Sequence, residues 1–206
     1  MNLPEGGREL DEQALAGRAR RGDDDAFASL VRRYEETAFR TAYLIVRDDA
    51  EAQDVAQEAF VRAHRSLGRF DERRPFRPWL LRIVTNLAFN SVRSARRRGA
   101  MAGRYERDEM TPTTEASPES AAVAAERAQR LWQAIGALGE NDQEVLYLRY
   151  FLDASEEETA EAIGRPAGTV KSRLHRALTK LRRVIETSYP DLSPEAAAYT
   201  QRGREA

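Results

Sequence analysis

Basic side chains gather in two separate parts of this chain. Between positions 62 and 104 arginine recurs throughout and only Asp71 and Glu72 oppose it, and between positions 165 and 183 there are no acids. The formal net charge of -1 hides this segregation. Clustered arginine and lysine bind phosphate groups, so two such clusters indicate a nucleic acid that is held at two places.

The second basic segment falls on a helix-turn-helix pattern. Residues 155–163 and 168–186 read as two helices joined by a turn at Gly164-Arg165-Pro166. Apolar residues of the second helix form a core stripe, so its polar residues project elsewhere, toward a groove of DNA. These polar residues are Lys171, Ser172, Arg173, Arg176 and Lys180. An antiparallel helical hairpin with a solvated basic face is the alternative.

Residue types that usually carry catalysis or metal ligation are sparse. The chain has no cysteine, and its two histidines, His64 and His175, are far apart in sequence. The acids at 23–25 and at 156–158 are adjacent residues that point different ways around a helix, so they suit helix caps better than a metal site. We therefore expect no enzymatic activity, no cofactor and no metal site.

Length and composition indicate small domains in the cytoplasm. The 206 residues are 41% hydrophobic and 33% charged, which suits modest cores better than one large core. The longest apolar runs, such as Trp79-Leu80-Leu81, are far shorter than the roughly 18 residues that span a bilayer. Because cysteine is absent and the N-terminus has no apolar stretch, we expect a soluble cytoplasmic protein.

Hydrophobic periodicity predicts an all-α protein. Apolar residues recur at helical spacing, and no run of β-branched residues alternates over the length of a strand. The acids at 23–25, the Ser-x-x-Glu pattern at 155–158 and the polar run from Asn141 resemble helix N-termini. We expect a loop at 70–78. The expected helices are 11–21, 24–46, 48–67, 79–98, 121–138, one that begins at 141, 155–163 and 168–186.

These helices group into two small helical domains joined by a flexible linker. The linker composition shifts to Gly, Thr, Pro, Ser and acids, with few large apolar residues. The expected division is an N-terminal extension at 1–23, a first domain at 24–98, a linker at 99–120, a second domain at 121–187 and a C-terminal tail at 188–206.

Three stretches carry a resemblance to a known family. They are Asp54-Val-Ala-Gln-Glu-Ala-Phe-Val-Arg-Ala-His-Arg65, Phe76-Arg-Pro-Trp-Leu-Leu-Arg-Ile-Val-Thr-Asn-Leu-Ala-Phe-Asn90 and Gly168-Thr-Val-Lys-Ser-Arg-Leu-His-Arg176. In order and spacing they resemble the extracytoplasmic-function group of sigma-70 factors, the subunits that direct RNA polymerase to promoters. The resemblance covers residues 24–98 and 121–186.

The resemblance implies that the first stretch docks on the coiled coil of the largest polymerase subunit. The residues that would do so are Asp54, Gln57, Glu58, Phe60 and Arg62. All except Phe60 lie on successive helical turns and form one polar stripe that a partner helix could meet. For Phe60, packing in the core is the alternative to a partner contact.

The resemblance also implies that the following loop and helix melt the minus-ten promoter element and capture an unstacked base. This role needs cations for the DNA backbone and aromatic walls for the base. The loop candidates are Phe70, Arg73, Arg74, Phe76, Arg77 and Trp79, and the candidates on a polar ridge of the helix are Arg82, Asn86, Asn90, Arg93 and Arg97. The alternatives are a solvated face for the ridge and a core position for Trp79. Many relatives carry Asp where this chain has Asn90, so a base preference does not transfer.

By the same resemblance the second domain reads the minus-35 element as duplex DNA. The candidate contacts are Thr169, Lys171, Ser172, Arg173, Arg176 and Lys180. The linker would thread the polymerase cleft or serve only as a solvated tether. The expected partners are core RNA polymerase, promoter DNA and an anti-sigma protein, with no insertion into a membrane.

Two other classes of protein compete with this interpretation. A free-standing helix-turn-helix regulator would bind duplex DNA tightly on its own and would not need the polar stripe that begins at Asp54. An RNA-binding adaptor would prefer single-stranded RNA to promoter DNA, since arginine-rich segments also bind RNA.

Overall fold

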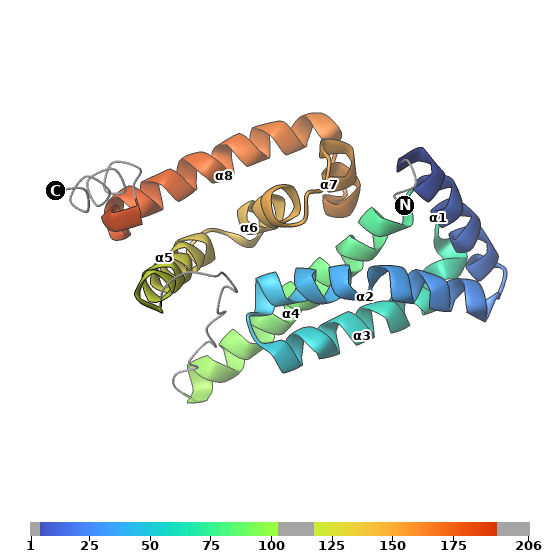
Figure 1. The fold of residues 1–206 in the computed structure, drawn as a ribbon, viewed down its shortest axis with the longest axis horizontal. Coiled ribbons are helices and arrows are strands. Elements are labelled where there is room, and N and C mark those ends of the chain that lie inside the picture. The colour runs from blue at the N-terminus through green and yellow to red at the C-terminus, as the bar shows by residue number, and fades with distance from the viewer. Residues whose placement is uncertain (1–4, 103–117, 193–206) are drawn as a thin grey trace. The chain divides into compact units, whose positions relative to one another are not determined.

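The computed structural model describes residues 5–102 and 118–192, with side chains described from 12 to 98 and from 124 to 192. Every regular element in these ranges is a helix (Figure 1), so the all-α prediction is confirmed. Across the same ranges, no helix is both long enough and apolar enough to span a bilayer.

Contacts divide the chain into two units, in agreement with the expected two small helical domains. The first unit joins residues 1–107 with residues 147–167, and the second joins residues 108–146 with residues 168–206. The segment 147–167 therefore packs with the N-terminal helices, although it follows the linker in sequence. Sequence reasoning divided the chain at the linker alone and did not foresee this grouping.

The predicted flexible linker lies mostly outside the described residues. Helix α4 (Phe76–Ala102) extends into the range 99–120, and helix α5 (Pro118–Gly136) begins before that range ends. The predicted tail at 188–206 also lies mostly outside the described residues. Its first part holds the short helix η3 (Pro190–Leu192), where Asp191 pairs with Arg130 of α5 at 3.0 Å.

Helices α1 (Glu5–Arg20) and α2 (Asp24–Val46) are separated by a turn that ends on a side-chain cap. The Asp23 carboxylate accepts a hydrogen bond from the Ala26 amide at 3.0 Å, which confirms the predicted cap. This hydrogen bond, followed by one from the Arg18 guanidinium, lowers the pKa of Asp23. The cap thus fixes where α2 begins.

Helices α3 (Asp49–Ser66) and α4 complete a bundle with α2, linked by helix η1 (Leu67–Arg69) and a short loop. The prediction that α4 begins at Trp79 was wrong, because the helix begins at Phe76. Proline is tolerated in the first turn of a helix, since the amide it lacks would have no partner within the helix. Pro78 therefore does not delay the start of α4.

Alanine supplies much of the buried face of α3 and part of the buried face of α2, and Ala88 lies on the buried face of α4. Ala38, Ala42, Ala52, Ala59, Ala63 and Ala88 are fully buried. Small side chains let helices approach closely, and larger residues such as Leu30, Leu80 and Val84 fill the remaining space. The three helices lie side by side in Figure 1.

The segment 147–167 contributes helices η2 (Tyr147–Phe151) and α7 (Glu156–Ile163) to the first unit. Ser155 and Glu158 form both hydrogen bonds of the predicted capping box. Helix α7 ends at Gly164, which has a left-handed φ of 62°. A Cβ at this position would also lie 3.1 Å from the guanidinium carbon of Arg82, but that exposed side chain can move aside, so the left-handed backbone is what favours glycine here.

The second unit contains α5, α6 (Glu140–Leu146) and α8 (Ala167–Ser188). The prediction that a helix opens at Asn141 was wrong, because α6 begins at Glu140. The Gly139 carbonyl accepts the amides of Asp142 and Gln143, and the Gln143 side chain returns a hydrogen bond to the Leu138 carbonyl at 2.7 Å. These contacts close the turn between α5 and α6.

We expect Leu30→Ala to destabilise the first unit strongly. Leu30 is fully buried, so the substitution removes apolar contacts and leaves a cavity, which lowers the free energy of unfolding by about 2–5 kcal/mol. Chemical denaturation followed by circular dichroism measures the change. Val61→Ala is the control, because Val61 is 42% exposed and should change stability by less than about 1 kcal/mol. Equal losses in both variants would contradict the described core.

Candidate nucleic-acid interface

The polar ridge predicted on α4 is exposed along its whole length. Arg82, Asn86, Asn90, Arg93 and Arg97 are all solvent-exposed. Leu80 and Val84 on the opposite side are buried, which fixes the direction in which the ridge faces. The Asn90 side-chain oxygen accepts a hydrogen bond from Arg93 at 2.5 Å, so the amide and the guanidinium present one surface. Such a surface offers donors to phosphates and amide groups to base edges.

Four aromatic rings from α2, the loop after η1 and the start of α4 form an aromatic cluster: Tyr34, Phe70, Phe76 and Trp79. The Phe70 and Trp79 ring centroids lie 4.8 Å apart, and those of Phe76 and Trp79 lie 5.4 Å apart. Phe70 and Phe76 are buried, whereas Trp79 is half-buried. The sequence prediction placed all three against DNA. Because both phenylalanine rings are buried, neither can stack on a base in this conformation, and both instead pack against Trp79.

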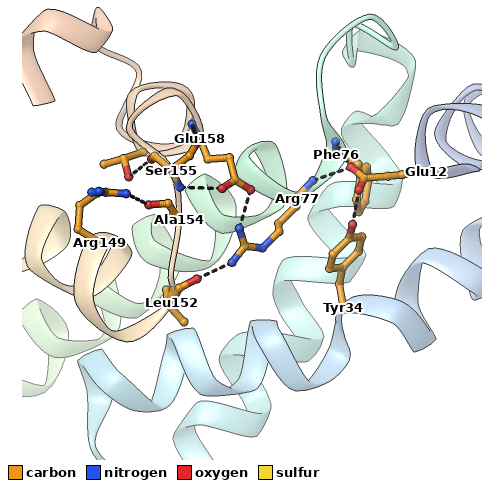
Figure 2. A network of polar contacts seen from close by, with 10 residues as sticks. Glu12, Tyr34, Phe76, Arg77, Arg149, Leu152, Ala154, Ser155 and Glu158 are labelled. Atoms are coloured by element: carbon orange, nitrogen blue, oxygen red, sulfur yellow. Dashed lines mark hydrogen bonds and ion pairs between the residues drawn. The ribbon is translucent and has the colours of Figure 1, made fainter. Parts of the chain in front are cut away.

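Two of the predicted DNA-binding arginines pair with acids of α7 inside the first unit. Arg77 contacts the Glu158 carboxylate at 2.5 Å and the Leu152 carbonyl at 2.6 Å. Arg74 binds both oxygens of Glu161, at 2.8 and 2.9 Å, and these hydrogen bonds raise the pKa of its guanidinium. Figure 2 shows Glu158 joining Arg77 to the Ser155 cap. Sequence reasoning read the acids at 156–158 as caps alone, and Glu161 carried no signal.

The polar stripe predicted on α3 is also accessible. Asp54, Gln57 and Arg62 are exposed and Glu58 is half-buried. Arg62 pairs with Glu58 at 2.7 Å, one helical turn away. Phe60 is only 9% exposed, so of the two alternatives for this residue the structure favours packing in the core. The accessible surface at this stripe includes the four polar residues and the exposed Val61.

Helix α8 presents a basic face in the second unit. Lys171, Ser172 and Arg176 are exposed, and Thr169 and Arg173 are half-buried. Val170 and Ala177 are fully buried, which sets the orientation of the helix. Lys180 binds the Asp142 carboxylate of α6 at 2.5 Å. Its ion pair gives Lys180 a structural role that the sequence prediction of a DNA contact did not include.

A buried carboxylate that sequence reasoning missed lies at the start of α4. Glu12 of α1 is 7% exposed and accepts hydrogen bonds from the Tyr34 hydroxyl and from the backbone amides of Phe76, at 2.5 Å, and Arg77, at 3.1 Å. Figure 2 shows its carboxylate between Tyr34 and Phe76. No local pattern distinguishes Glu12, because its partners lie 22 to 65 positions along the chain.

Comparison with known proteins decides the family. The models for sigma-70 region 2 and sigma-70 region 4 match residues 30–98 and 128–181. The ECF RNA polymerase sigma factor SigW of Bacillus subtilis is 33% identical over 178 residues, which cover 81% of this chain and 92% of that protein. The chain belongs to the extracytoplasmic-function sigma factors. It acts in promoter-directed initiation of transcription.

Two further relatives span almost the same length. The RNA polymerase sigma-H factor of Pseudomonas aeruginosa is 36% identical over 182 residues, covering 85% of this sigma factor and 94% of that one. The solved structure of CnrH in complex with the cytosolic domain of CnrY has a TM-score of 0.62 and 26% identity, and covers 86% of this chain and 99% of CnrH. The match to region 2 begins at residue 30, so Glu12 of this sigma factor lies outside it.

We expect the stability of this sigma factor to fall as pH rises above about 10. Burial, followed by the hydrogen bond to Glu12, raises the pKa of the Tyr34 hydroxyl. A raised folded-state pKa means that Tyr34 stays protonated in the fold after it would ionise in the unfolded chain. The stability that the protonated Tyr34 contributes is therefore complete below the pKa of tyrosine in the unfolded chain. It is lost as pH rises through the higher pKa of Tyr34 in the folded protein.

Chemical denaturation of the native chain and of Tyr34→Phe, at a series of pH values below and above about 10, measures the free energy of unfolding of each. The variant should lose less stability than the native chain as pH rises. Tyr150→Phe is the control, because Tyr150 is 57% exposed and should leave the pH dependence unchanged. Parallel pH curves for the native chain and Tyr34→Phe would refute the assignment.

Proposed function

We propose that this sigma factor binds core RNA polymerase through the polar stripe of α3 and holds promoter DNA with α4 and α8. In this scheme the chain is a cytoplasmic, non-catalytic subunit. The polar ridge and Trp79 take the non-template strand of the minus-ten element, and the basic face of α8 takes the minus-35 duplex. The observation that carries the proposal is the exposed polar ridge of α4, which begins at Arg82 and ends at Arg97. The half-buried Trp79 lies one helical turn before the start of this ridge.

A ridge of this composition suits separated strands better than closed duplex. Arg82, Arg93 and Arg97 supply charge for a phosphate backbone, and Asn86 and Asn90 supply amide groups that can pair with the edges of unstacked bases. Trp79 is half-buried beside the start of the ridge, and base stacking on an aromatic ring contributes about 1–3 kcal/mol. Phe70 and Phe76 contribute by holding Trp79 in place.

The two DNA contacts reinforce one another because they belong to one chain. Each surface is small, and binding at one raises the effective concentration of the other at its own promoter element. Two weak contacts then select promoters by spacing as well as by sequence. This division also explains why the basic residues are segregated rather than spread over the surface.

Arg74 and Arg77 take different roles in the same scheme. Both guanidinium groups pair with α7 carboxylates, but Arg74 is exposed and Arg77 is part-buried. Solvent-exposed ion pairs contribute only about 0–1 kcal/mol, so promoter phosphates can replace the Glu161 pairing of the exposed Arg74 at small cost. We assign Arg73 and Arg74 to the DNA backbone and Arg77 to the support of the loop.

An anti-sigma protein completes the proposed set of partners. CnrH, which shares the fold and 26% of its residues with this chain, was solved together with the cytosolic domain of CnrY. We propose a partner of the same kind here. A free-standing helix-turn-helix regulator is not favoured, because the chain matches both sigma regions in order.

We expect the double variant Asp54→Ala, Gln57→Ala to weaken binding to core polymerase by at least about tenfold, because truncation of central contact residues commonly costs that much. Both side chains are exposed, so the fold should survive, whereas Phe60→Ala would damage the core. Co-elution with core polymerase on a sizing column measures the loss. Glu36→Ala, an exposed substitution on α2, is the control.

Normal co-elution of the folded double variant would remove the α3 stripe from the proposal. If the native chain itself did not co-elute and instead retarded duplex DNA alone, the protein would act as a free-standing regulator.

We expect Lys171→Ala, Arg173→Ala to reduce promoter selection and its salt dependence while leaving core binding intact. Each lost phosphate contact lowers the slope of log affinity against log salt by about 0.9, so the slope should fall by up to about two. Filter binding of holoenzyme to promoter DNA over a salt series measures it. Arg182→Ala, Arg183→Ala removes the same charge near the end of α8 and should change the slope less. Loss of core binding in the first variant would contradict the division of roles.

A further inference from the structure

The start of α4 poses a hydrogen-bonding problem that its own sequence does not solve. The first four backbone amides of a helix have no partner within the helix. In α4, which begins at Phe76, these positions are Pro75, Phe76, Arg77 and Pro78. Both prolines lack an amide hydrogen, so two donors are left, and Pro75 has no side chain that could cap them.

Glu12 accepts both remaining amides. Its Oε1 atom lies 2.5 Å from the Phe76 nitrogen and 3.1 Å from the Arg77 nitrogen, and its Oε2 atom accepts the Tyr34 hydroxyl. Every available donor in the first turn of α4 is thus satisfied by one side chain from α1. A carboxylate at this place also interacts favourably with the positive end of the helix dipole.

Residues at the end of α1 also lie near the loop that precedes α4. Arg20 and Arg21 lie 3.9 and 3.8 Å from the Glu72 carboxylate. A Cβ at Gly17 would come within 3.0 Å of the same carboxylate, so this part of α1 lies directly against the loop. Arginines at the end of α1 thus lie near the exposed side of this loop, while Glu12 binds the amide at its buried end.

The contacts of Glu12 extend to the aromatic cluster. Glu12 binds the Tyr34 hydroxyl and the Phe76 backbone, and the ring centroids of these two residues lie 5.9 Å apart. Phe76 in turn contacts Trp79 at 5.4 Å. Phe76 is fully buried and its ring packs against Trp79. A shift of the first turn of α4 would therefore also move Trp79 and the adjoining polar ridge.

We infer that Glu12 is a positioning residue for promoter opening: it caps α4 from outside the region 2 segment and so sets where Trp79 and the polar ridge stand. The inference rests on the proposed function of α4. Glu12 does not contact DNA in this scheme. It acts through the Phe76 and Arg77 amides, and it occupies the α4 N-terminus that a phosphate would otherwise find open.

The test compares Glu12→Ala with Glu12→Gln in the full chain bound to core polymerase. The probe is a fluorescent single-stranded DNA of the minus-ten region, taken from a promoter that the native holoenzyme selects from random duplex DNA. Glutamine keeps the length and an oxygen acceptor for the two amides, whereas alanine leaves both unpaired. Glu36→Ala is the matched control, since Glu36 is exposed on α2.

We expect Glu12→Ala to bind this probe about tenfold more weakly, which corresponds to about 1.4 kcal/mol, and to co-elute normally with core polymerase. Hydrogen exchange should accelerate at the Phe76 and Arg77 amides. Glu12→Gln should restore probe affinity to within about threefold of native. If Glu12→Ala does not fold, Glu12→Asp replaces it, because the shorter side chain keeps the charge and cannot reach both amides.

Native probe affinity in a folded Glu12→Ala variant would overturn the inference. Equal losses of probe affinity in Glu12→Ala and Glu12→Gln, with hydrogen exchange accelerated throughout the first unit, would also overturn it. That pattern indicates a general loss of stability. If the native holoenzyme does not hold the probe, the proposed function of α4 fails and the role in promoter opening fails with it. In that case, hydrogen exchange that is faster in Glu12→Ala only at the Phe76 and Arg77 amides would still support Glu12 as the cap of α4.

Discussion

The close packing of α2, α3 and α4 is the constraint on which the surfaces of the first unit depend. Fully buried residues such as Ala38, Ala59 and Ala88 leave little space between the helices, so long charged side chains can only point outward. On α3 this places acids and amides on an exposed stripe, and on α4 it places arginines and asparagines on another. One small core thereby separates the two exposed polar surfaces that we assign to polymerase and to DNA.

Acidic residues complete this arrangement by fixing basic residues and amides in place. Asp142 holds Lys180, Glu158 holds Arg77 while it also caps α7, and Glu12 holds the start of α4. The near-neutral total charge therefore includes some acids that pair with cations inside a unit, whereas the cations of the polar ridge and several of those on α8 remain exposed. A charge count along the sequence does not distinguish these two kinds of basic residue, because pairing depends on distance in space.

Much of the candidate site followed from helical periodicity. The exposure of the polar ridge, of the α3 stripe and of Lys171 and Arg176 agrees with the sequence prediction, since residues three and four apart share a helix face. The aromatic residues were less predictable. Phe60, Phe70 and Phe76 are buried, because large rings bury wherever a small core has space for them, and periodicity does not show where that space lies.

By itself the sequence determined the helical class, the caps at Asp23 and Ser155, the turn at Gly164 and the family, because each depends on neighbouring residues or on motifs read in order. Tertiary structure alone decided that α4 begins at Phe76, that Glu12 caps it and that 147–167 packs with the N-terminal helices. Glu12 and Phe76 are 64 residues apart. A hydrogen bond over that separation has no local signature, since it exists only once the chain has folded and brought the two together.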